Sequence, residues 1–118
     1  MGKSHLYILK NYYPLLKKRK IIKILDFGCG NGRNSFFLKS KGFDVFAIDS
    51  EPVISKSKME FIKSNIPFKS YTLNSTKIPY EKESFEGIIA WRVLHRGFKK
   101  YRQRLLKELY RILKKMAI

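Results

Sequence analysis

Apolar residues along the chain fall into short runs that predict four β-strands. Residues 21–27 and 44–48 are mostly apolar and rich in β-branched side chains, which is typical of strands buried on both faces of a sheet. Residues 68–73 alternate polar and apolar side chains, and residues 85–91 form a further apolar run. Strands buried on both faces indicate a parallel sheet that is covered by helices on each side.

Between these runs, apolar positions change to the three-and-four spacing of amphipathic helices. Pro14 falls inside the first such segment and is expected to kink or split that helix, whereas Gly42 should stop the second. Pro52 stands just inside the start of the third helix, with Asp49 or Ser50 available as its N-cap. The predicted helices comprise residues 4–19, 35–39, 52–64 and 101–116.

Alternating strands and helices predict an α/β fold with right-handed crossovers. No repeat, low-complexity tract or linker divides the sequence, so we expect residues 1–118 to form one domain, with residues 1–20 as an N-terminal helical segment. A short helix near Thr76 and Lys77 would make the alternation complete.

Composition narrows the classes of protein that fit this pattern. With 118 residues and 44% hydrophobic residues, the chain has the size of a single globular domain. Its one cysteine, Cys29, excludes an intrachain disulfide and a cysteine-based metal cluster, so we expect a reducing, cytoplasmic setting. No apolar stretch approaches the length that spans a bilayer, and we expect no membrane partner.

The charge balance is unusual, because 26 Lys and Arg residues against 9 Asp and Glu residues give a net charge of +17. Such an excess attracts polyanions such as nucleic acid. Biased coding or adaptation to heat would also produce a lysine-rich chain, so both interpretations stay open. A candidate phosphate-binding surface, which could equally be a solvated helix face, comprises Phe98, Lys99, Lys100, Tyr101, Arg102, Arg104 and Lys107.

A glycine loop between the first predicted strand and the next helix carries the clearest chemical signal. Gly28, Gly30 and Gly32 let the backbone turn sharply and approach a ligand, with free N–H groups at the helix start. Asp49 follows at the end of the second strand, where a carboxylate can accept hydrogen bonds from ribose hydroxyls. The loop and the acid together predict a nucleoside-cofactor site.

Two details separate this loop from a dinucleotide site. The dinucleotide pattern is G-x-G-x-x-G, whereas Arg33 occupies the position of its third glycine. Asp26, two residues before the first glycine, suits a cationic ligand better than a pyrophosphate. S-adenosyl-L-methionine carries an ammonium and a sulfonium group, and the loop therefore favours this cofactor over NAD.

The order of several motifs resembles that of a known family. Residues 24–35 and 42–49 resemble the first two motifs of class I, Rossmann-like S-adenosylmethionine-dependent methyltransferases, particularly small ones of the tellurite-resistance or methyltransferase-11-like type. Residues 74–80 and 84–95 resemble the family patterns D-a-x-x-L-P-f and s-F-D-x-I-x-x-x-x-v-L-h-h. The resemblance covers residues 21–115 and implies a three-layer sandwich with a truncated, mostly parallel sheet of about four strands in the order 3-2-1-4.

By this resemblance, the loop glycines would line the methionine moiety, Asp26 would help to bind its ammonium group through water or backbone groups, and Asp49 would hold the ribose. Asn74, near the adenine, replaces the usual Asp and would accept a hydrogen bond more weakly. Glu86 likewise replaces an Asp that is common in the family. The expected cofactor-binding residues are Asp26, Gly28, Cys29, Gly30, Gly32, Asp49, Ser50, Asn74, Ser75 and Trp91.

Methyl transfer mainly requires that donor and acceptor are positioned and, for some acceptors, that a proton is removed. No nucleophile or metal site is needed, and the sequence contains no motif for a metal. His95, after the fourth strand, is a candidate base, with a structural role as its alternative. Asp26 and Asp49 could also serve merely as loop caps, and Cys29 as a packing residue.

The family pattern continues beyond the last predicted helix with further strands, which this sequence lacks. Its fourth strand would then be an open edge with Ile88 and Ile89 nearby, and we expect a homodimer that protects this edge, with a truncated gene product as the alternative. Two functions stay open: a methyltransferase with an unknown acceptor, and a non-catalytic remnant of the fold that binds the cofactor or nucleic acid.

Overall fold

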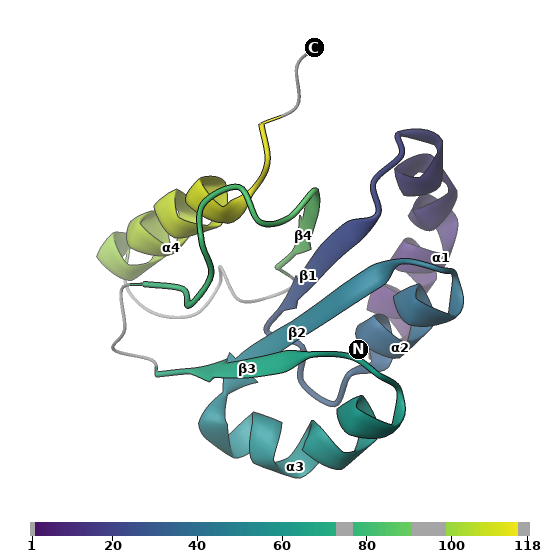
Figure 1. The fold of residues 1–118 in the computed structure, drawn as a ribbon, viewed down its shortest axis with the longest axis horizontal. Coiled ribbons are helices and arrows are strands. Elements are labelled where there is room, and N and C mark those ends of the chain that lie inside the picture. The colour runs from purple at the N-terminus through teal and green to yellow at the C-terminus, as the bar shows by residue number, and fades with distance from the viewer. Residues whose placement is uncertain (1, 73–76, 91–98, 116–118) are drawn as a thin grey trace.

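A four-stranded parallel sheet lies between two layers of helices in the computed structural model, which describes residues 2–72, 77–90 and 99–115 (Figure 1). The strands are β1 (Lys23–Phe27), β2 (Asp44–Ser50), β3 (Phe68–Tyr71) and β4 (Gly87–Ile89). The helices are α1 (Gly2–Lys18), α2 (Arg33–Ser40), α3 (Glu51–Lys63) and α4 (Lys99–Ile112). The strand order is β3-β2-β1-β4, and every pair is parallel, which confirms the predicted α/β class and order 3-2-1-4.

The two faces of the sheet are covered unequally. Helices α1, α2 and α3 lie on one face and α4 lies on the other (Figure 1). Successive strand residues point to opposite faces; Ile24 packs with the α1–α3 layer, whereas Leu25 and Phe27 pack with α4. This alternation explains why both strand faces had to be apolar in the sequence. None of the helices in the described part of the chain has the length and apolar content of a membrane span.

Several predicted boundaries differ from the observed ones. Helix α1 continues through Pro14 rather than splitting there, and Pro14 lies on its exposed side, where the carbonyl that lacks a donor can face water. The predicted helix at Thr76 and Lys77 is not found at Lys77, and Thr76 lies outside the described residues.

The predicted fourth strand and last helix are both shorter than expected. Helix α4 ends at Ile112, whose carbonyl accepts hydrogen bonds from the N–H groups of Ser84 and Phe85. Leu113 then forms an isolated parallel bridge with Phe85, outside β4. Residues 112–114 therefore pair with residues 84 and 85 instead of continuing the helix. This pairing covers the outer side of the segment that leads into β4, the edge strand. The expected homodimer stays a prediction.

Helices α1, α2 and α3 all end in the same hydrogen-bonded turn. In each turn, the N–H of the second residue past the helix donates to the carbonyl three residues earlier, and the next N–H donates to the carbonyl five residues earlier, which is a Schellman motif. The residues with positive φ are Lys20 (58°), Gly42 (91°) and Asn65 (56°). Since each helix runs back across the sheet, these ends lie where the strands begin. We call this side the amino edge and the opposite side, where the strands end, the carboxyl edge.

Candidate functional site

The predicted glycine loop lies at the carboxyl edge, between β1 and α2. All three of its glycines have positive φ, with values of 79° at Gly28, 57° at Gly30 and 87° at Gly32. Side chains with a Cβ atom rarely adopt this conformation. The sharp turn that the sequence predicts is therefore present.

Two of these glycines are required for different reasons. A Cβ atom on Gly32 would lie 2.7 Å from Phe61 and 2.9 Å from Phe36, so this position is closed by the packing of α2 against α3. A Cβ atom on Gly30 would meet nothing within 4 Å. Gly30 therefore borders open space at the carboxyl edge, and a ligand could approach its backbone closely.

The loop N–H groups, expected to be free, are instead engaged within the protein. Those of Gly28 and Cys29 both donate to the carbonyl of Ile48, at 2.8 and 3.1 Å, and join the loop to the end of β2. The Gly32 N–H donates to the carbonyl of Cys29 at 3.0 Å. For these three donors the expectation was wrong, because the loop, once turned back toward β2, satisfies them locally.

Asp49, at the end of β2, faces this loop. One carboxylate oxygen accepts a hydrogen bond from the Gly30 N–H at 2.9 Å, and the other accepts one from the Ser50 N–H at 2.7 Å. A carboxylate has about four acceptor positions, so half remain for a ligand's hydroxyl groups. Ser50 occupies the N-cap position of α3 as predicted, but its side chain forms no capping hydrogen bond.

Asp26 lies beneath the loop rather than at its surface. Its side chain is 2% exposed and accepts a hydrogen bond from the Ser35 hydroxyl at 2.7 Å. Burial raises the pKa of Asp26 to about 6; the Ser35 hydrogen bond opposes this rise, and the nearby Asp49 carboxylate adds to it. A direct contact between this carboxylate and a ligand's ammonium group does not fit such burial, so any influence on a ligand is exerted through the loop.

Cys29 is also enclosed by the loop and the core. It is 8% exposed, and its pKa is raised by burial and by the neighbouring carboxylates of Asp26 and Asp49. A thiol with a raised pKa stays protonated at neutral pH and is a poor nucleophile. The side chain of Cys29 therefore serves packing, and its backbone is the part that belongs to the loop.

Two serines that support the loop were not among the expected site residues. The Ser57 hydroxyl, on α3, donates to the carbonyl of Gly30 at 3.1 Å, and Ser35, on α2, holds Asp26. Both serines are buried. Small polar residues at buried positions of otherwise amphipathic helices were the signal that could have pointed to these contacts.

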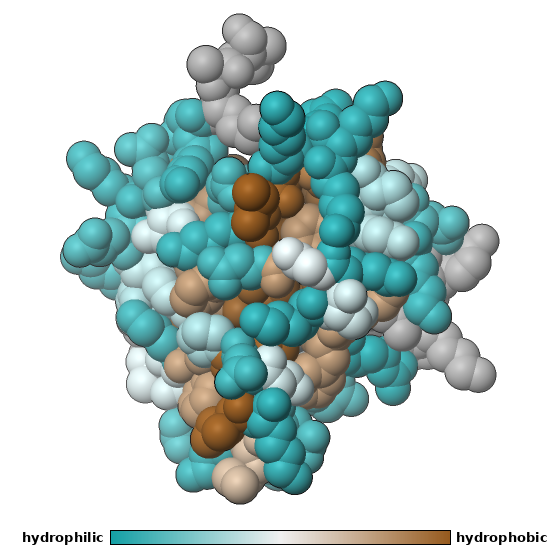
Figure 2. Space-filling model, turned by 45° about the vertical axis from the view of Figure 1, so that its right-hand side comes forward, coloured by the Kyte–Doolittle hydropathy of each residue, from teal (hydrophilic) through white to brown (hydrophobic). Residues whose placement is uncertain are grey.

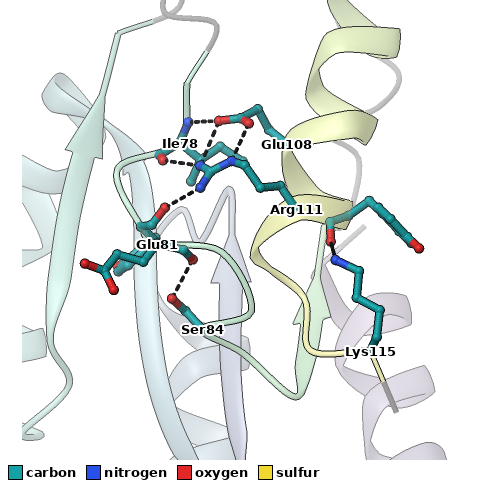
Figure 3. A network of polar contacts seen from close by, with 8 residues as sticks. Ile78, Glu81, Ser84, Glu108, Arg111 and Lys115 are labelled. Atoms are coloured by element: carbon teal, nitrogen blue, oxygen red, sulfur yellow. Dashed lines mark hydrogen bonds and ion pairs between the residues drawn. The ribbon is translucent and has the colours of Figure 1, made fainter. Parts of the chain in front are cut away.

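A second polar network fixes the segment that leads into β4 against α4 (Figure 3). Glu108 accepts a hydrogen bond from the Ile78 N–H at 2.7 Å, and Arg111 donates to the carbonyls of Ile78 and Tyr80, each at 2.9 Å. The Arg111 guanidinium also pairs with Glu108 at 2.6 Å and lowers the pKa of that carboxyl. Residues 77–80 are thereby anchored to the helix that covers the second face of the sheet.

Four expected site residues, Asn74, Ser75, Trp91 and His95, lie outside the described residues, as does Phe98 of the candidate phosphate-binding surface. The structure brings together the other members of the set at the carboxyl edge: the three glycines, Cys29, Asp49, Ser50 and, beneath them, Asp26. Within residues 2–72, 77–90 and 99–115, no group of three or more His, Cys, Asp or Glu residues could hold a metal ion.

Residues 24–116, which include the loop, Asp49 and all of the sheet except the first residue of β1, match the protein family described as "Methyltransferase domain". The chain belongs to this family. Methyltransferase-domain proteins among the solved structures also share its fold. The SAM-dependent methyltransferase from Methanosarcina mazei superposes with a TM-score of 0.65 at 28% identity, over 78% of this chain and 47% of that one.

Two further relatives extend the comparison. The PH0226 protein from Pyrococcus horikoshii OT3 superposes with a TM-score of 0.76 at 30% identity, over 93% of this chain and 53% of that one. The protein named Hemagglutinin 1 from Eikenella corrodens is 32% identical over 71 residues, which are 58% of this chain and 23% of that protein. The methyltransferase domain described here thus spans about half the length of these solved structures and a smaller part of the curated relative.

Proposed function

We propose that this domain binds S-adenosyl-L-methionine at the carboxyl edge and transfers a methyl group to an acceptor that the sequence does not specify. The observation that carries the proposal is the position of Asp49, which is hydrogen-bonded to Gly30 beside open space. Membership of the methyltransferase-domain family and the likeness to a SAM-dependent methyltransferase support the choice of cofactor.

The residues present fit this cofactor. The carboxylate of Asp49 has acceptor positions left for the two ribose hydroxyls, and the Gly30 backbone borders space that a side chain would fill. The buried carboxylate of Asp26 contributes negative charge beneath the loop, in surroundings where electrostatic attraction to an ammonium group is weakly screened. When bound, the cofactor supplies a methyl group that its sulfonium has already activated.

The protein's own part in such a reaction is to position the reactants rather than to supply a nucleophile. Ser57 and Asp49 hold the carbonyl and the N–H of Gly30, respectively, so the loop is fixed before a ligand arrives. A preformed loop lowers the entropy that is lost on binding. The Glu108–Arg111 pair gives similar support to residues 77–80, next to the segment that the family resemblance places near the adenine.

Calorimetry with S-adenosyl-L-methionine and S-adenosyl-L-homocysteine tests the site. Asp49→Ala removes the acceptor for the ribose and for Gly30, and we expect it to weaken binding by at least about 1.5 kcal/mol, roughly tenfold, as expected for hydrogen bonds to a charged group. Asp44→Ala is the matched control, since Asp44 begins the same strand at the opposite edge. We expect it to leave the affinity unchanged.

Equal affinities of the wild type and Asp49→Ala would refute the assigned role of Asp49, and absence of binding to the wild type would refute the proposal. Binding of the cofactor with no methyl transfer to any small-molecule, protein or RNA acceptor would instead favour the second candidate, a cofactor-binding domain without turnover.

A further inference from the structure

A hollow of about 340 Å³ opens at the amino edge, on the side of the sheet opposite the glycine loop. It lies between the end of α1, the residues that lead into β1 and the turn that joins α2 to β2. We call it the amino-edge hollow; its lining residues are Lys17, Lys20, Ile21, Ile22, Gly42 and Phe43. None of them belongs to the candidate cofactor site, so the hollow requires an explanation of its own.

Basic side chains surround the amino-edge hollow. The end of α1 and the following turn carry four consecutive basic residues, 17–20, all of them exposed. The elements that meet at the hollow carry further basic residues, which are Lys23 at the start of β1 and Lys39 and Lys41 at the end of α2. Two acidic residues lie at the same edge: Asp44, which begins β2, and Glu86, which accepts hydrogen bonds from the N–H groups of Ile22 and Lys23. The positive charge at this edge is thus only partly offset.

The backbone of Lys20 is strained, so a lysine at this position lowers the stability of the fold. Three helices end in the same turn, and two of them use Gly42 and Asn65, the residue types that tolerate positive φ. The third uses Lys20, at a φ of 58°, and this conformation costs a lysine about 1 kcal/mol. Strained residues persist where another requirement outweighs stability, and Lys20 lines the hollow.

Lys17, also in the lining, is held in place by its surroundings. Its ammonium nitrogen lies 5.4 Å from the centre of the Phe43 ring. A Cβ atom on Gly42 would lie 3.4 Å from the same nitrogen, so this ammonium group lies directly against the turn that ends α2. Two lysines therefore line the hollow: the ammonium group of Lys17 lies over the Phe43 ring, and Lys20 lies in a strained turn.

The surface around the hollow is not purely polar. Ile22 is 58% exposed and lines it, while Tyr12 and Leu15 are exposed on α1. Figure 2 turns the α1 and α2 side of the molecule toward the viewer and shows apolar side chains in a band bordered by hydrophilic ones. A ligand that fits would combine negative charge with flat or apolar groups.

We propose that the amino-edge hollow binds the phosphate backbone of a nucleic-acid strand. One phosphate would lie between Lys17 and Lys20, and the adjacent basic side chains would contact neighbouring phosphates, while Ile22 offers an apolar contact to a sugar or base. Nucleic acid fits better than a membrane surface, because a strand can place one phosphate in a concave site and the next along its rim. The net charge of +17 favours a polyanion over a single small anion.

Fluorescence anisotropy with a short labelled oligouridylate measures this binding at several salt concentrations. The triple variant Lys17→Gln/Arg19→Gln/Lys20→Gln should weaken binding at least about tenfold at about 0.1 M salt and reduce the slope of log K against log salt by about 2. The matched control, Lys99→Gln/Lys100→Gln/Lys107→Gln, removes three charges from exposed positions of α4 instead. It should weaken binding less than about threefold.

Lys20→Gly provides a variant whose folding is not in doubt, because glycine suits the positive φ of this turn. It should weaken binding about two- to threefold while the free energy of unfolding is maintained or raised.

Equal losses in the two triple variants would overturn the proposal in favour of a response to net charge alone. A loss confined to the α4 variant would place the nucleic-acid surface on α4, and binding to vesicles containing phosphatidylserine, but not to the oligonucleotide, would identify a membrane surface; either result overturns the proposal. These readouts do not involve the cofactor, so they are independent of the proposed methyltransferase activity.

Discussion

The amino and carboxyl edges of the sheet differ in which residue types adopt positive φ in their turns. At the carboxyl edge, three alternating glycines carry positive φ, and their N–H groups bond to Ile48, Asp49 and the loop itself. At the amino edge, the turns that end α1, α2 and α3 use three different residue types, including Lys20. Identical backbone requirements are thus met by the sequence in different ways, depending on what surrounds each turn.

The surroundings account for this difference. The carboxyl edge is crowded on one side of its loop and open on the other, so that neither Gly32 nor Gly30 can be replaced without consequence. The amino edge is occupied by lysines, several of which lie over aromatic rings; Lys41 lies 5.1 Å from the Tyr13 ring centre, and Lys23 lies 4.9 Å from that of Phe46. We infer that the carboxyl edge requires glycines because a side chain would fill space that neighbours or a ligand need. At the amino edge, we infer that Lys20 is kept for its positive charge.

The largest expected effect tests the claim about space. Gly32→Ala adds a Cβ atom that would meet Phe61 and Phe36 in a left-handed conformation, and it should lower the free energy of unfolding by about 3 to 4 kcal/mol. Gly30→Ala meets no neighbouring atom and should cost about 1 kcal/mol while weakening cofactor binding. Urea unfolding of both variants checks the difference, and equal destabilisation would show that the two glycines are not distinguished by their surroundings.

A smaller effect concerns the buried acid at the carboxyl edge. Burial raises the pKa of Asp26 to about 6, so the folded state favours the protonated form of this side chain. The contribution of Asp26 to the free energy of unfolding is therefore fully present at low pH and is lost as the pH rises through about 6. Asp26→Asn keeps an acceptor for Ser35 without the charge. Its stability relative to the wild type should therefore increase by about 2 to 3 kcal/mol between about pH 4 and pH 8.

Thermal unfolding of both proteins across this pH range measures that increase. Since other titrating groups are common to both, their contributions cancel in the difference. A difference that does not vary with pH would mean that Asp26 has an ordinary pKa.

The smallest effect tests the claim about charge at the amino edge. Lys20→Gly relieves a left-handed lysine and should raise the free energy of unfolding by about 0.5 to 1 kcal/mol. Lys18→Gly, two residues earlier and still within α1, should lower it by a similar amount, because glycine weakens a helix. Denaturant unfolding distinguishes the two, and destabilisation by both would show that the turn does not strain Lys20.

The sequence by itself determined the α/β class and the position of the glycine loop. Each of these follows from local information: apolar runs that must be buried on both faces, and glycines at positions where a Cβ atom cannot be accommodated. The end of the second predicted strand pointed to Asp49, which the structure brings to Gly30, and the family resemblance added the strand order 3-2-1-4.

Only the tertiary structure decided which hydrogen-bond partners the polar groups around the loop have. The hydrogen bond of Ser35 to Asp26, the contact of Ser57 with Gly30 and the Glu108–Arg111 support of residues 77–80 each join two different elements of the fold. The end of α4 was likewise decided by pairing with Phe85, which no periodicity within the helix could reveal. The physical reason is common to these cases, because a hydrogen-bond partner is chosen by proximity after folding, whereas sequence patterns record the periodicity of each element before it is packed.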